Sequence, residues 1–207
     1  EGFISQWKYP EANLGFEPVQ IAYIMDNNGE PRPNGWSLFT SLRNALGVSA
    51  LHSPGNSSAN FNWWTPALNW GPRRAGTDLD PYRPFLGGKG IPYGDKNKYY
   101  LMSHHEVDYS GWEAALNYTG SGWLPPHEFA SRIATGHKSY FVLSWGPFNL
   151  PPYASERLTV VYAFGVNVHT TPTAFTQLFR ATNPGPFMAQ LNFQDLIDKT
   201  NVIFKSE

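Results

Sequence analysis

Two short runs of β-branched and aromatic residues constrain the fold of this chain more than any other feature. Ser139–Trp145 reads SYFVLSW and Leu158–Val166 reads LTVVYAFGV, and the segment between them begins with Gly146-Pro147. Residues of these types favour extended strands that place one face of a pleat in a core. Because turn-forming residues separate the runs, the pair predicts two strands of a sheet.

Weaker patterns predict the other elements. Val19–Met25 and Ala45–Leu51 are apolar runs that end in turn-forming residues, so each predicts a strand. Apolar residues at helical intervals over residues 190–204 predict one C-terminal helix. Lys98–Ser103 fits either a strand or a short helix, and Ser110–Leu116 fits a helical turn.

Composition favours many short strands joined by tight turns. The chain has 207 residues, 41% of them apolar, and its 19 Gly and 18 Pro follow no period. We therefore expect an all-β fold, an antiparallel, jelly-roll-like β-sandwich that forms a single domain over residues 1–207. Within it, residues 1–17 are a candidate N-terminal arm that completes a neighbour's sheet, and residues 56–95 are an ordered insertion rich in aromatic residues.

Charge and cysteine content exclude several classes of function. Fifteen Lys and Arg stand against 16 Asp and Glu, without a basic run, so nucleic acid is a poor candidate partner. No apolar stretch approaches the ~20 residues that span a bilayer. The absence of Cys excludes disulfides, thiolate nucleophiles and cysteine metal sites. The chain begins with Glu1 rather than Met, and we expect a mature or cut product.

The segment Phe141–Pro152, FVLSWGPFNLPP, followed by Leu158–Phe164, LTVVYAF, resembles a recurrent module of uncharacterised secreted bacterial proteins. These are large multidomain surface proteins of Bacteroidota-like bacteria, in which a strand ending LS-x-GPF leads through a turn into a strand of the vvfAf type. The resemblance implies secretion or a cell-surface location and a β-sandwich, and it supplies no catalytic residue. One departure is Pro152-Tyr153-Ala154-Ser155, which stands where the module usually has Pro-Gly.

Three tryptophans suggest a carbohydrate site. Trp63, Trp64 and Trp70, with Asn62 beside them, could form a platform, because a flat indole stacks on a pyranose and an amide can bind its hydroxyls. The alternative is that these rings pack the insertion into place, since dense tryptophans are first of all core material.

The densest group of metal-capable side chains is His104-His105-Glu106-x-Asp108. In a strand His104, Glu106 and Asp108 would share one face and could hold a divalent ion. The alternative is a polar, hydrogen-bonded surface without a metal.

The sequence carries little of the pattern expected of an enzyme. It has neither a Gly-x-Ser-x-Gly elbow nor a Gly-rich phosphate loop, and we assign no catalytic residue and no cofactor. We expect a non-catalytic structural or interaction module, secreted or at the cell surface, whose partners are sibling domains or copies of itself. The alternatives are a carbohydrate-binding module with polysaccharide as partner and a metal-assisted hydrolase. An exposed apolar patch or a free sheet edge would support the first hypothesis.

Overall fold

The structure is a computed structural model that describes residues 1–8, 16–26, 43–66, 71–72, 94–103, 107–116, 129–171 and 173–205. The sequence predicts a single domain, whereas the contacts divide the chain into two compact units. The first unit comprises Glu1 and His52–Thr159, and the second comprises Gly2–Leu51 and Val160–Glu207.

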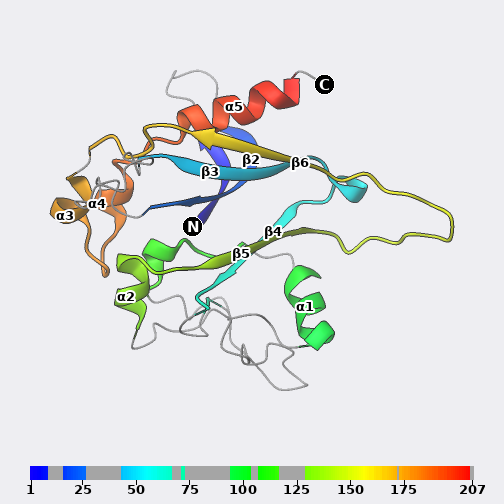
Figure 1. Ribbon diagram of the computed structural model, residues 1–207, viewed down its shortest axis with the longest axis horizontal. Coiled ribbons are helices and arrows are strands. Elements are labelled where there is room, and N and C mark those ends of the chain that lie inside the picture. Colours follow the sequence, from blue (N-terminus) through cyan, green and yellow to red (C-terminus); the bar gives the residue numbers. More distant parts are fainter. Residues whose placement is uncertain are drawn as a thin grey trace, which may run out of the picture. The chain divides into compact units, whose positions relative to one another are not determined.

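The second unit is built on a four-stranded sheet in the order β1-β2-β3-β6 (Figure 1). β2 is antiparallel to both β1 and β3. The strands predicted at Val19–Met25, Ala45–Leu51 and Leu158–Val166 are confirmed. The strands are β1 (Gly2–Lys8), β2 (Phe16–Met25), β3 (Ala45–His52) and β6 (Thr159–Gly165).

Helix α5 (Gln194–Lys205) covers one face of this sheet and confirms the predicted C-terminal helix. Leu196 is fully buried and fits against Gly47 on β3 and Gly165 on β6. A Cβ at either glycine would come within 3.0 Å of Leu196, so both strands need a residue without a side chain here. Phe193, just before the helix, contacts the ring of Tyr23 with centroids 4.6 Å apart.

Two short helices, α3 (Ala174–Leu178) and α4 (Gly185–Met188), lie between β6 and α5 in the sequence. Phe187 is fully buried, and its ring contacts those of Phe175 and Phe179 edge-on. The ring of His169 lies 5.9 Å from that of Phe187. These aromatic contacts hold the segment between the last strand and the last helix.

The N-terminal strand pairs within its own chain. Gly2–Lys8, which we predicted as part of an arm for a neighbour's sheet, lies antiparallel to β2. Ile4 stands opposite Ile21, and both are buried on the face that α5 covers. This burial stabilises intrachain pairing of the strand.

The first unit contains a two-stranded antiparallel sheet of β4 (Ala59–Trp64) and β5 (Tyr140–Trp145). β5 confirms the strand predicted at Ser139–Trp145, and every residue of β4, within the predicted insertion, is buried. The ambiguous Lys98–Ser103 is helical, and the predicted helical turn begins with a capping box between Ser110 and Glu113. The unit's helical segments are η2 (Pro54–Asn56), α1 (Gly94–Ser103), η3 (Gly111–Glu113) and α2 (Ala130–Thr135).

The part of the chain described is rich in antiparallel strands with short helices, which confirms a mostly-β fold. Over those residues, no helix is both long enough and apolar enough to cross a membrane.

Candidate interaction surface

Strand β6 is apolar on both of its faces. Val161 and Ala163 are buried, and Gly165 packs under Leu196, so these side positions face α5. The alternate residues Val160, Tyr162 and Phe164 are 39%, 69% and 53% exposed. An antiparallel strand with one solvated face normally carries polar residues on that face, whereas a continuous apolar run is typical of a strand buried on both. The solvent-exposed face of β6 therefore carries apolar side chains of the kind that are normally buried.

Strands β2 and β3 extend this apolar face. Ile24 and Leu46 are register partners, and both are exposed. Since Gly47 faces α5, its neighbour Leu46 lies on the opposite face, as Tyr162 and Phe164 do. At roughly 150–250 Å² for a full aromatic side chain, the exposed parts of Tyr162 and Phe164 alone amount to about 200–300 Å², and Val160, Ile24 and Leu46 enlarge the patch. A patch of this size on a monomer is often an interaction site.

Hydrogen bonds show which backbone groups of β6 face outward. Beyond the strand, the N–H groups of Asn167 and His169 donate to Asn44 Oδ1 and Arg43 O, at the entrance to β3. The N–H of Val166 donates to Asp195 Oδ2 on α5 instead, at 2.8 Å. Because backbone direction alternates along a strand, the even-numbered residues of β6 direct their N–H and C=O groups away from β3. β6 is a terminal strand of the sheet, so among the described strands none pairs with this outer edge.

An ion pair on α5 covers one end of the outer edge. Lys199 Nζ lies 2.8 Å from Asp195 Oδ2 and donates to Phe164 O at 3.0 Å. The hydrogen bond from Lys199, followed by that from the Val166 N–H, lowers the pKa of Asp195. Charged side chains at a strand edge oppose the addition of another strand. Here they reach only the end at Phe164 and Val166.

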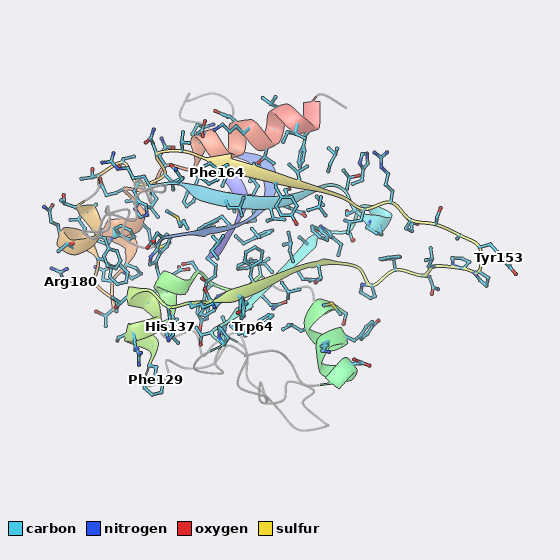
Figure 2. All side chains as sticks on the ribbon, in the orientation of Figure 1. Trp64, Phe129, His137, Tyr153, Phe164 and Arg180 are labelled. Atoms are coloured by element: carbon cyan, nitrogen blue, oxygen red, sulfur yellow. The ribbon has the colours of Figure 1, made fainter. Side chains whose placement is uncertain are left out.

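A shallow groove of about 560 Å³ runs between β6 and the last turns of α5. The helix contributes two exposed apolar side chains to it, Val202 and Ile203. Figure 2 labels Phe164, which borders the groove from the strand. The groove thus adds apolar contacts on the α5 side of an open strand edge. Its lining residues are Tyr162, Ala163, Phe164, Asp198, Lys199, Val202 and Ile203.

The loop between β5 and β6, which belongs to the first unit, is a second exposed apolar feature. Every residue from Pro147 to Leu158 is exposed, and Tyr153 stands at the tip with its ring in solvent (Figure 2). Phe148 and Leu150 line a hollow of about 320 Å³ beside Trp145. Large exposed apolar side chains are less closely spaced along this loop than along β6. The loop also lacks the regular strand backbone that could pair with an added strand.

The tryptophans predicted as a sugar platform lie in the core of the first unit. Trp63 and Trp64 are 1% and 8% exposed, so neither presents a ring face to solvent. Trp63 Nε1 donates to Tyr109 O at 2.6 Å, and the Asn62 amide lies 3.4 Å from the Asp108 carboxylate. Trp70 lies outside the described residues, and the carbohydrate prediction for it stays a prediction.

Asp108, predicted as a metal ligand, is bonded to the backbone instead. Its Oδ2 accepts the N–H of Trp63 at 2.9 Å, and its own N–H donates to Phe61 O at 2.8 Å. These bonds hold the 107–110 segment alongside β4. His104 and Glu106 lie outside the described residues. In the ranges that the structure covers, no three acidic or histidine side chains gather around a common point.

No protein-family model matches the chain, and no curated protein or solved structure is significantly similar to it. The resemblance to the secreted bacterial module therefore stays a hypothesis based on the quoted motifs.

Sequence reasoning did not identify the β6 surface, although part of its signal is present. Leu158–Val166 is apolar at nearly every position, which distinguishes it from a strand with a solvated face. Asp195 and Lys199 have the i, i+4 spacing of a helical ion pair. The terminal position of β6 in the sheet is the missing information, because it depends on pairing between distant strands.

Proposed function

We propose that this chain is a non-catalytic interaction module of a secreted or cell-surface assembly, and that it binds through the exposed face and outer edge of β6. The observation that carries the proposal is the exposure of Val160, Tyr162 and Phe164 on a strand whose opposite face is also apolar. Covering these side chains releases about 25 cal/mol for each Å² removed from water. The open backbone edge adds hydrogen-bonding groups that an extended partner can match.

The location and the finer fold are part of the same proposal. The extracellular or cell-surface setting is supported by the LS-x-GPF resemblance at Leu143–Phe148. A jelly-roll-like sandwich is supported by the apolar face opposite α5, because a second sheet would pack on such a face. An intrachain sheet on this face is therefore the rival to a partner, and the test has to separate the two.

Photo-cross-linking from β6 tests the proposal. A benzophenone amino acid replaces Tyr162, and the labelled chain is irradiated together with surface and extracellular material from its producing cells. We expect a discrete adduct between the chain and another polypeptide. The matched control replaces Tyr153, another exposed tyrosine of the chain, and we expect it to give no such adduct.

Two results would contradict the proposal. An adduct confined to the chain itself would show that an intrachain sheet covers the face. Equal, diffuse labelling from both positions would show that β6 has no partner of its own.

A further inference from the structure

We propose that the partner at β6 is a second copy of this chain, and that two β6 strands pair antiparallel about Tyr162. The inference rests on the proposed function and identifies the occupant of its surface. The pairing would join the two four-stranded sheets into one continuous sheet with a two-fold axis beside Tyr162. Both copies would then use the same residues, as a closed two-fold interface requires.

The backbone of β6 fits this register. Tyr162 is an even-numbered residue, so its N–H and C=O both face the outer edge, as the outward bonds of Phe164 and Val166 indicate. In an antiparallel pair, two opposed residues of this kind exchange both hydrogen bonds. Tyr162 would therefore bond to Tyr162 of the other copy, and Val160 would stand opposite Phe164.

The side chains match in the same register. The central pair is aromatic on aromatic, and the flanking pairs are aromatic on β-branched, which are stabilising combinations across strands. β6 contains no charged residue, so no like charges meet across the axis. The net charge of −1 gives two copies little long-range repulsion. A heterologous partner would have to supply this apolar, uncharged strand, whereas a second copy already has it.

The Asp195–Lys199 pair permits this register but weakens the association. The ion pair covers the strand edge at Phe164 and Val166. In the two-fold arrangement it would lie near the Thr159 end of the other copy's β6, away from the central Tyr162 pair. The Phe164 carbonyl has a second lone pair for the incoming strand. The Lys199 side chain is 47% exposed and can swing into solvent.

The exposed area predicts a weak dimer. Edge-to-edge pairing leaves the outward faces of Val160, Tyr162 and Phe164 partly in water, so the apolar area that both copies bury together stays below roughly 1,000 Å². This total lies at the lower limit of specific interfaces, where association is reversible. We expect a dissociation constant in the micromolar range, roughly 1–100 μM.

Charge reversal at the axis tests the pairing. Sedimentation equilibrium of the purified chain should show a mass that rises with concentration from 23.3 kDa towards twice that value. Tyr162→Lys and Tyr162→Glu should each weaken dimerisation about tenfold or more, because like charges would face each other across the axis. An equimolar mixture of the two variants should recover a heterodimer, since opposite charges then meet. Tyr153→Lys is the matched control and should dimerise as the unmodified chain does.

Each contrary result has a defined meaning. A chain that stays monomeric to about 1 mM, a dissociation constant equivalent to only 4 kcal/mol, overturns the inference. Variants that dimerise normally, or a mixture that stays monomeric, overturn the register about Tyr162. Circular dichroism of each variant checks folding, which an exposed substitution should leave intact. A monomer that still gives the interchain adduct in native material retains the proposed function with a different partner, and the absence of both removes both proposals.

Discussion

The contact between Gly165 and Leu196 makes a specific prediction about how α5 is held on the sheet. A Cβ at Gly165 would lie 2.6 Å from Leu196 Cβ and 3.1 Å from its Cα and N. Carbon atoms in contact are normally about 3.5–4.0 Å apart, so Gly165→Ala must displace the helix by about 1 Å. Leu196 cannot relieve this contact by changing its rotamer, because the nearest atoms belong to its Cβ and backbone.

The expected loss of stability is about 1–2 kcal/mol. Overpacking of a core costs about 1–3 kcal/mol, and the stiffer unfolded chain of the alanine variant offsets about 0.4–1 kcal/mol of it. Gly185→Ala is the matched control, because its Cβ would meet only Asn183 Oδ1 at 3.8 Å. We expect that control to cost less stability than Gly165→Ala, because only the backbone preference of a residue before Pro186 opposes its Cβ.

A double-mutant cycle separates the two glycines under Leu196. At Gly47 the added Cβ would meet the Leu196 Cδ atoms and Ile21 Cγ2, which are side-chain tips. Leu196→Ala removes those Cδ atoms and should itself cost about 2–5 kcal/mol of stability. The double variant Gly47→Ala/Leu196→Ala should then lose about 1 kcal/mol less than the sum of the two single variants. The same cycle with Gly165→Ala should be close to additive, because alanine keeps the Cβ that clashes.

Urea unfolding and hydrogen exchange measure these effects. Gly165→Ala should lower the urea midpoint by about 0.5–1 M, and amides of α5 should exchange faster. A Gly165→Ala variant as stable as Gly185→Ala, with unchanged protection in α5, would refute the packing of Leu196 against β6. Equal coupling in both cycles would refute the distinction between side-chain and backbone contacts.

Three further predictions follow from single groups. Burial of His169 lowers its pKa, so the unfolded chain binds a proton at this side chain at a higher pH than the folded chain does. The free energy of unfolding should therefore fall as the pH drops below about 6.5. Urea titrations at several pH values should show that His169→Gln removes this fall. Asp195 also has a lowered pKa, so its stabilising contribution is present above pH 3.8 and is lost as the pH falls through the folded pKa. In hydrogen exchange, Asp195→Asn should remove the pH dependence of α5 amide protection over that acidic range. A pH dependence that persists in the variant would point to other carboxylates. Asp108→Ala should destabilise the β4 region by about 1–3 kcal/mol, because the buried N–H of Trp63 loses its acceptor, and unchanged exchange at Trp63 would contradict that role.

The sequence predicts the strands and the last helix well where local chemistry decides the outcome. β5 and β6 are rich in β-branched and aromatic residues, and α5 places Leu196 and Ile197 towards the core at helical spacing. β1 and β4 are harder to predict, because their stability depends on partners far away in the chain. Ile4 requires Ile21 beside it, and Asn62 lies in a buried strand because Asp108 and its surroundings supply polar contacts.

The candidate surface required information that no local pattern contains. The apolar run of β6 predicts burial on both faces, and only the strand order shows that its outer edge has no strand beside it in the described sheet. The tryptophan and His-Glu-Asp patterns were informative about residue type but not about exposure. Asp108 accepts the backbone N–H of Trp63 on β4, the Trp63 indole donates to Tyr109 O, and both side chains are buried.

The position of the protecting charges is compatible with the reversible association proposed at β6. A strand that must never pair usually carries a Lys or a Pro within itself, or lies under a loop, and these devices are permanent. β6 has none of them in its own sequence, and its protection comes from Asp195 and Lys199 on α5. Both side chains are more than one-third exposed, and an exposed ion pair is worth about 1 kcal/mol or less. A pair this weak can delay edge-to-edge contact but cannot prevent it, so the edge stays available to a strand that fits Tyr162 and Phe164.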